Sequence, residues 1–343
     1  MQSLRRAGFP GISVAIGLLL GLGAMEGVVR VFSLASPLQP VFANYVTDPN
    51  LPFRPRPLSR NTGHTAEFAY DYRHNSLGFR DQEHEFAKQP GVVRILGLGD
   101  SFTYGVGAAY DETWLSRLQT MLDARRGPYG EVEVIRGGIP RYFPETERIL
   151  LEHDGVRFHP DLILVGVLPN DVVDTHFGLD AVTTDSTGYL RTREAKLLGR
   201  WGVLIYRYSH LGRLVLRVYI EGTSRLKEDR FFLDGGPYEQ DWTKMEREFG
   251  RMAAVADSIG AKLLLIHIPQ KGPWSEQSRY LPARLSAWAA RNGVLFLDVL
   301  PAMQRQPNPE RLYYPDDGHC TPTGYEVIAD TVFQYLTDRK LVP

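Results

Sequence analysis

The chain has 343 residues, enough for one large domain or two small ones. Its 39 basic and 40 acidic residues give a net charge of -1, and no extended basic stripe is present, which argues against a nucleic-acid partner. The only cysteine, Cys320, excludes an intrachain disulfide and leaves the redox compartment open.

The N-terminal segment has the pattern of a membrane anchor. An apolar run over residues 7–24 follows a basic pair, Arg5 and Arg6. About 18 apolar residues are the minimum for spanning a bilayer, and the arginines favour a cytoplasmic N-terminus. A cleaved signal peptide is the alternative, but Leu22 occupies a position where a cleavage site needs a small residue. We therefore expect residues 1–34 to form an uncleaved signal anchor, with the rest of the chain in the periplasm or outside the cell.

A proline-rich stretch follows the apolar run. Six prolines fall between residues 36 and 59, at the spacing of an extended chain with little regular structure. We expect residues 35–74 to be an extended tether. The main domain is expected to begin with a turn at residues 75–81 and to continue to residue 338.

The main domain alternates short apolar strands with helices. This pattern predicts an α/β fold of three layers, flavodoxin-like, with a five-stranded parallel sheet in the order 2-1-3-4-5. The predicted strands are residues 92–98, 132–135, 162–167, 263–268 and 294–299, and the predicted helices are residues 112–124, 144–153, 243–259, 282–291 and 322–336.

One long insertion interrupts the alternation, over about residues 172–240. Its segment 197–219 is apolar and aromatic at helical spacing, so we expect a helix there. Four arginines within that segment exclude a second membrane span. The helix is expected to pack on the domain or to form a lid near the membrane.

Polar residues follow three of the predicted strands, and another polar group precedes the last helix. Ser101 ends the run Gly99-Asp100-Ser101 after the first strand, at the edge where open α/β sheets bind ligands. A serine hydroxyl is a weak nucleophile and needs a general base, which His319 can supply. Either Asp316 or Asp317 can orient the imidazole and stabilise its charged form.

Acyl transfer also creates an oxyanion, which needs hydrogen-bond donors that are already in place. The backbone amides of Ser101 and Gly138 and the side-chain amide of Asn170 can supply three such donors. The alternative hypothesis is a flavodoxin-like cofactor-binding protein in which the loop at Ser101 binds phosphate. This hypothesis assigns no role to the later Asp-Gly-His run. The remaining histidines are scattered and lack the spacing of a helical metal site.

These residues carry a resemblance to a known family. Ser101, Gly138, Asn170 and His319 occur in the order of the four blocks of the SGNH (GDSL) hydrolase superfamily, and the chain resembles its membrane-anchored bacterial members. The resemblance covers roughly residues 75–336. It implies a serine ester hydrolase or acyltransferase with no metal or organic cofactor.

The chain departs from the family pattern in its second block. Arg136 and Arg141 occupy places that often hold asparagine and glycine. The two arginines make the expected pocket rim more basic, which favours an acidic or acyl-anionic substrate, unless they are a solvated surface pair. In members of the family, the aspartate that orients the catalytic histidine stands three or two residues before it. These positions correspond to Asp316 and Asp317, and we favour Asp317 because it belongs to the Asp-Gly-His run.

We therefore expect a membrane-anchored serine esterase that removes acyl groups, O-acetyl first, from cell-surface glycans or lipids. An O-acyltransferase and a catalytically silent glycan-binding protein are the alternatives. The expected partners are an acylated small molecule or glycan and the membrane, with no nucleic acid. The acyl group, the acceptor and the oligomeric state are left open.

Overall fold

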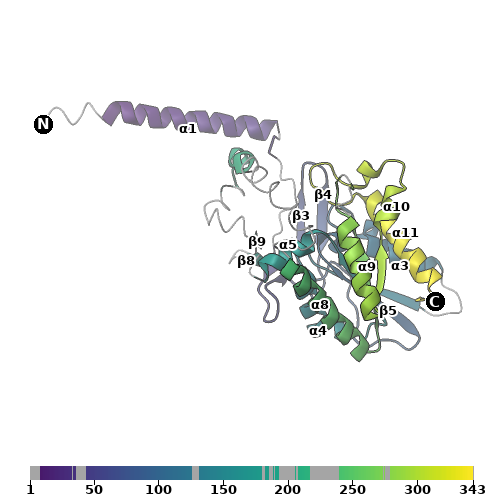
Figure 1. Ribbon diagram of the computed structural model, residues 1–343. Coiled ribbons are helices and arrows are strands. Elements are labelled where there is room, and N and C mark those ends of the chain that lie inside the picture. Colours follow the sequence, from purple (N-terminus) through teal and green to yellow (C-terminus); the bar gives the residue numbers. More distant parts are fainter. Residues whose placement is uncertain are drawn as a thin grey trace. The chain divides into compact units, whose positions relative to one another are not determined.

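The structure, a computed structural model, divides into two compact units (Figure 1). The first unit comprises residues 1–37 and 193–227, and the second comprises residues 38–192 and 228–343. The described residues are 8–32, 34–35, 44–125, 131–179, 182–184, 188, 190–192, 205, 208–216, 239–272, 274 and 279–342.

The first unit contains a long apolar helix, α1 (Gly8–Val31). Its stretch Gly11–Val31 has a mean hydropathy of 2.0 and is only 6% buried. The helix is therefore long and apolar enough to cross a membrane, and a signal sequence would have the same properties.

The end of α1 binds a short helical segment of the insertion. The Glu26 carboxylate accepts hydrogen bonds from the amides of His210 and Leu211, each at 2.8 Å. Arg30 donates to the carbonyl oxygen of Tyr208 at 2.6 Å. Residues 210–216 are helical, whereas most of the predicted helix 197–219 lies outside the described residues.

A five-stranded parallel sheet forms the centre of the second unit, in the order β11-β10-β7-β5-β6. Read from the other edge, this is the predicted order 2-1-3-4-5. The pairing of Gly99 with Gly138 brings the carboxyl ends of β5 and β6 side by side. The strands are β5 (Val92–Gly99), β6 (Glu131–Gly138), β7 (Leu162–Val167), β10 (Lys262–His267) and β11 (Leu295–Asp298).

Helices cover both faces of the sheet and make three layers (Figure 1). Strand β7 is buried throughout, and its alternate residues enter different cores: Ile163 and Val165 belong to one, Leu162 and Leu164 to the other. The first core contains α4 (Pro144–His153), α8 (Glu239–Ser258) and α9 (Tyr280–Asn292); the second contains α3 (Trp114–Ala124), α10 (Leu300–Gln304) and α11 (Pro322–Asp338).

The expectation of an extended tether over residues 35–74 is wrong for its described part. Four short strands form two antiparallel pairs there: β1 (Tyr45–Val46) with β2 (Arg54–Pro55), and β3 (Arg60–His64) with β4 (Ala69–Arg73). Phe53 and Tyr72 are buried, at 1% and 0% exposure. The prolines are compatible with strands because these strands are short and lie in two-stranded sheets, where few ladder hydrogen bonds are required.

The insertion begins later than predicted. Helix α5 (Asn170–Phe177) belongs to the main domain, since its Val172 lies in the core beside the sheet. The described part that follows contains an antiparallel pair, β8 (Val182–Thr184) with β9 (Leu190–Thr192).

Candidate active site

Ser101 lies on a sharp turn between β5 and α2 (Ser101–Tyr104). Gly99 has a φ of +148°, and a side chain there would collide with Thr103. Asp100 caps the helix by accepting the Phe102 amide at 2.9 Å. The turn therefore holds the serine at the carboxyl edge of the sheet.

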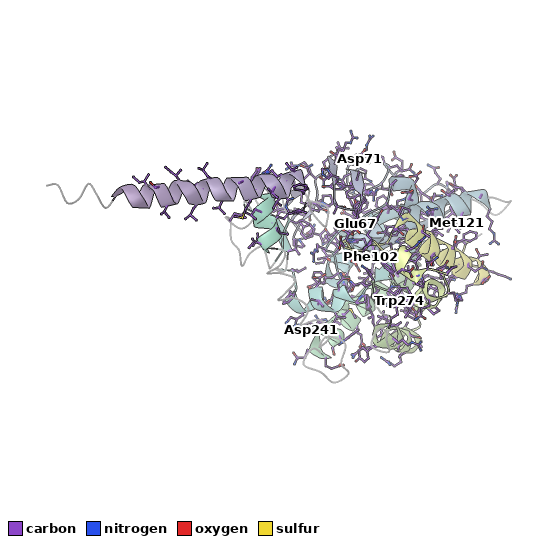
Figure 2. The ribbon with its side chains drawn as sticks, turned by 90° about the horizontal axis from the view of Figure 1, so that it is seen from above. Glu67, Asp71, Phe102, Met121, Asp241 and Trp274 are labelled. Atoms are coloured by element: carbon purple, nitrogen blue, oxygen red, sulfur yellow. The ribbon has the colours of Figure 1, made fainter. Side chains whose placement is uncertain are left out.

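His319 connects Ser101 to Asp317 in a chain of hydrogen bonds. Its Nε2 lies 2.8 Å from Ser101 Oγ, and its Nδ1 lies 2.5 Å from Asp317 Oδ1. Both His319 and Asp317 are 7% exposed. The Phe102 ring, labelled in Figure 2, packs 4.9 Å from the imidazole between ring centroids. Because the carboxylate can only accept at Nδ1, Nε2 is left to accept the serine proton.

The structure separates the two candidate acids. Asp317 faces His319, whereas the Asp316 side chain is exposed and has no contact with the imidazole. The Asp316 and Asp317 amides both donate to the carboxylate of Glu67, at 3.1 and 2.6 Å. Glu67 lies in the turn between β3 and β4, and no sequence pattern indicated it, because that segment was expected to be a tether.

Asn170 lies at the start of α5 and its side chain has a fixed orientation. Its Nδ2 donates to Asp100 Oδ2 at 3.1 Å, and its Oδ1 accepts a hydrogen bond from Gln270 Nε2 at 2.7 Å. The amide group is therefore directed toward Asp100, the neighbour of Ser101. Gln270 was missed at the sequence level, although its position just after β10, at the same sheet edge, is a usable signal.

Gly138 ends β6 and is buried against α2. A Cβ at this position would lie 2.4 Å from the Tyr104 backbone nitrogen. The next amide, of Ile139, donates to the Gly99 carbonyl at 2.9 Å. Glycine is therefore required for the close approach of β6 to the turn that carries Ser101.

Buried carboxyl groups surround the serine turn. Burial raises the pKa of Asp100, and it raises the pKa values of Glu147 and Asp171 well above the ordinary range. Burial therefore disfavours the charged form of each of these carboxyl groups. No three or more His, Cys, Asp or Glu side chains in the described part of the chain are arranged to hold a metal ion.

The two arginines of the second block have different environments. Arg136 is buried and donates to Asp81 at 2.6 Å and to Ser116 at 2.9 Å, so the expectation that it lines the pocket rim is wrong. Arg141 is half-buried and lines a hollow with Phe143. The sequence alone could not separate the two arginines, because the burial and the ion pair of Arg136 depend on its tertiary neighbour Asp81.

Residues 98–327 match the sequence model of the GDSL-like lipase/acylhydrolase family, which is about two thirds of the chain. The chain belongs to this family. The GDSL match contains Ser101, Gly138, Asn170 and His319. No curated protein matches the chain significantly.

Several solved structures resemble this GDSL-family chain at low sequence identity. A lipase/acylhydrolase from Enterococcus faecalis is 16% identical, with 72% of this chain and 96% of that chain covered and a TM-score of 0.43. A putative lipolytic G-D-S-L protein from Desulfitobacterium hafniense is 13% identical (71% and 98% covered, TM-score 0.42). A catalytic mutant of an acetylxylan esterase from Geobacillus stearothermophilus is also 13% identical (71% and 93% covered, TM-score 0.43).

Proposed function

We propose that this GDSL-family protein is a serine esterase that uses Ser101, His319 and Asp317. The observation that carries the proposal is the hydrogen-bonded chain of 2.8 and 2.5 Å from the serine through the imidazole to the carboxylate. Nucleophile, base and orienting group are within the hydrogen-bond reach that such catalysis requires. Asp316 has no part in this mechanism, because its side chain does not reach the imidazole.

In the proposed mechanism His319 Nε2 takes the proton from Ser101 Oγ as the oxygen bonds to the ester carbonyl carbon. The imidazolium, stabilised by Asp317, then gives that proton to the leaving alcohol oxygen. An acyl-enzyme remains on Ser101. Water attacks it by the reverse route and releases the acid.

The oxyanion is held in this proposal by the Ser101 and Gly138 amides and by Asn170 Nδ2. The hydrogen bonds of Asn170 with Gln270 and Asp100 hold its side chain beside the serine turn and support its role, because the second Nδ2–H makes only a long contact of 3.4 Å with Asp174 and can exchange it for the oxyanion. Loss of one such donor typically costs about 10²- to 10³-fold in turnover.

The proposed substrates are ester-linked acyl groups, O-acetyl first, on glycans or lipids outside the cytoplasm. The support is α1, which is apolar enough to anchor the chain, together with the basic pair Arg5 and Arg6 before it. An O-acyltransferase would use the same site and differ only in the final step, where a second hydroxyl replaces water. A silent glycan-binding protein has no use for the complete hydrogen-bonded chain at Ser101.

Turnover of p-nitrophenyl acetate by the full-length protein in detergent tests the proposal. Ser101→Ala and His319→Ala should each lower kcat on the order of 10⁴-fold or more, because each removes a group that takes part in bond making. Ser258→Ala, at an exposed serine whose hydroxyl bonds only the Val255 carbonyl, is the matched control and should retain turnover.

Fluorophosphonate labelling gives a second readout, with adduct formation expected at Ser101 and absent in Ser101→Ala. Full turnover in Ser101→Ala would refute the serine mechanism. Folded wild-type protein that neither turns over ester nor takes up the label would favour the binding protein. Labelling without ester hydrolysis would favour the acyltransferase.

A further inference from the structure

Arg141 has a backbone conformation that arginine adopts only at a cost. Its φ is +69°, in the left-handed region, within a turn closed by the hydrogen bond from the Tyr142 amide to the Ile139 carbonyl at 3.1 Å. The left-handed conformation costs about 1–2 kcal/mol for a residue with a side chain, because its Cβ comes too close to the backbone, whereas glycine adopts it freely. Strain of this kind at the carboxyl edge of the sheet points to a function for the side chain.

The guanidinium of Arg141 has no hydrogen bond and no ion pair with any residue of the described chain. This group carries five N–H donors and is half-buried. Arg136, five residues earlier, forms an ion pair with Asp81, so the lack of a described partner distinguishes Arg141 from its neighbour in the second block. A permanently charged fork with no partner among the described residues is suited to a ligand carboxylate.

Arg141 lies close to the proposed catalytic groups. It lines a narrow surface hollow, which has no room for a water molecule between its walls, together with Asp174 and apolar side chains that include Phe53 and Phe143. Asp174 Oδ2 lies 3.4 Å from Asn170 Nδ2, so the hollow adjoins the proposed oxyanion donor.

The charge of Arg141 also reaches the serine turn. Burial raises the pKa of Asp100, and Arg141 is among the groups that oppose this rise. The carboxylate of Asp174, the other charged group on the hollow, accepts from Asn170 and forms no ion pair with Arg141. An anionic ligand group is therefore favoured on the side of the hollow that Arg141 occupies, away from the Asp174 carboxylate.

We propose that Arg141 binds a carboxylate carried by the ester substrate and thereby selects anionic esters over neutral ones. This inference rests on the proposed esterase function and adds a substrate class to it. The carboxylate can belong to the acyl part or to the alcohol part of the ester, and the experiment distinguishes the two.

Two matched ester pairs test the inference on the full-length protein in detergent. For the acyl part, p-nitrophenyl hemiglutarate is compared with p-nitrophenyl pentanoate; for the alcohol part, 4-acetoxybenzoate is compared with 4-acetoxybenzamide. Ser101→Ala supplies the blank for spontaneous hydrolysis. Wild-type kcat/KM should favour the anionic member of at least one pair, and the pair that responds identifies the part that carries the charge.

The variant Arg141→Gly removes the guanidinium and suits the left-handed backbone. It should lower the anionic-to-neutral ratio of kcat/KM by roughly 10- to 100-fold, the usual value of a charge-assisted hydrogen bond at a binding site. Arg141→Gln should lower the ratio similarly. Arg291→Gln, at an exposed arginine near the end of α9, is the control and should keep the wild-type ratio.

Two results overturn the inference while leaving the esterase intact: turnover of all four esters without preference for charge, or an unchanged ratio in Arg141→Gly. Absence of turnover and of fluorophosphonate labelling in the wild type would instead refute the esterase function itself.

Discussion

Asp316 and Asp317 are neighbours in the chain, but only Asp317 reaches His319. Gly318 has a φ of +85°, and this turn folds the chain so that Asp317 Oδ1 accepts both the His319 amide and its Nδ1–H. The Asp316 side chain is exposed to solvent. A spacing of two residues is therefore compatible with the chemistry only because glycine stands between the acid and the base.

Exchange of each acid for its amide should separate the two. Asp317→Asn removes the charge that stabilises the imidazolium, so kcat for p-nitrophenyl acetate should fall by roughly 10²- to 10⁴-fold. Asp316→Asn is the matched control, and its kcat should stay within about 3-fold because its side chain touches no group of the site. Equal losses, or a larger loss in Asp316→Asn, would contradict this assignment.

The residues at the site differ in how far the sequence indicates them. Ser101, Asn170 and His319 could be predicted because each lies within a motif next to a strand end or a helix start. Glu67 could not, because its partners lie some 250 residues away in the chain. Gln270 follows the end of β10, which is a signal, but its partner Asn170 is 100 residues away and no motif connects the two. Long-range hydrogen bonds leave no local pattern.

At the level of elements, the buried parallel strands were predictable and the small antiparallel pairs were not. β7 has the predicted bounds because a strand covered on both faces is a continuous apolar run. β3 is polar at nearly every position, and only Asn61 is buried in it. Its pairing with β4 depends on tertiary contacts, such as the burial of Tyr72 against Tyr104 at 5.1 Å between rings.

The β3–β4 hairpin is expected to contribute to catalysis through Glu67. Its carboxylate holds the amides of Asp316 and Asp317, so Glu67→Ala should loosen the loop that positions the acid. We expect kcat to fall by roughly 5- to 30-fold, the equivalent of about 1–2 kcal/mol for a lost charged hydrogen bond, with little change in KM.

Two further variants control this prediction. Asp71→Ala alters the same hairpin (both residues are labelled in Figure 2), but its carboxylate pairs with exposed Arg60, so kcat should stay within about 2-fold. Glu67→Gln keeps an acceptor oxygen and should recover most of the activity. A loss as large in Asp71→Ala as in Glu67→Ala would assign the effect to the hairpin as a whole.

At the level of the whole molecule, the chain separates into a catalytic unit and a unit built around α1. Most of the family match lies in the second unit, namely residues 98–192 and 228–327. The first unit contains α1 and part of the insertion. Glu26 and Arg30 join these two parts of the first unit by hydrogen bonds to Ser209, His210, Leu211 and Tyr208. The insertion is thus connected to the proposed anchor, a relation between distant segments that the sequence pattern did not contain.

Retention of α1 in the mature protein is the last prediction. The full-length chain, expressed in a Gram-negative host with a C-terminal tag, should stay in the membrane after alkaline washing, with residues 1–34 intact by mass spectrometry. Protease added to spheroplasts should remove the tag, because a basic pair before an apolar helix favours a cytoplasmic N-terminus and hence a C-terminal part outside. Arginines at Leu19 and Leu20 (Leu19→Arg with Leu20→Arg) cost about 2.5–3.5 kcal/mol each at a helix centre and should release the protein or block its insertion. Leu58→Arg, at an exposed leucine of the second unit, should leave the protein in the membrane.

Two outcomes would contradict this prediction. A mature chain that lacks its first residues and washes off the membrane would show that α1 is a cleaved signal. A tag protected from protease would show the opposite membrane orientation.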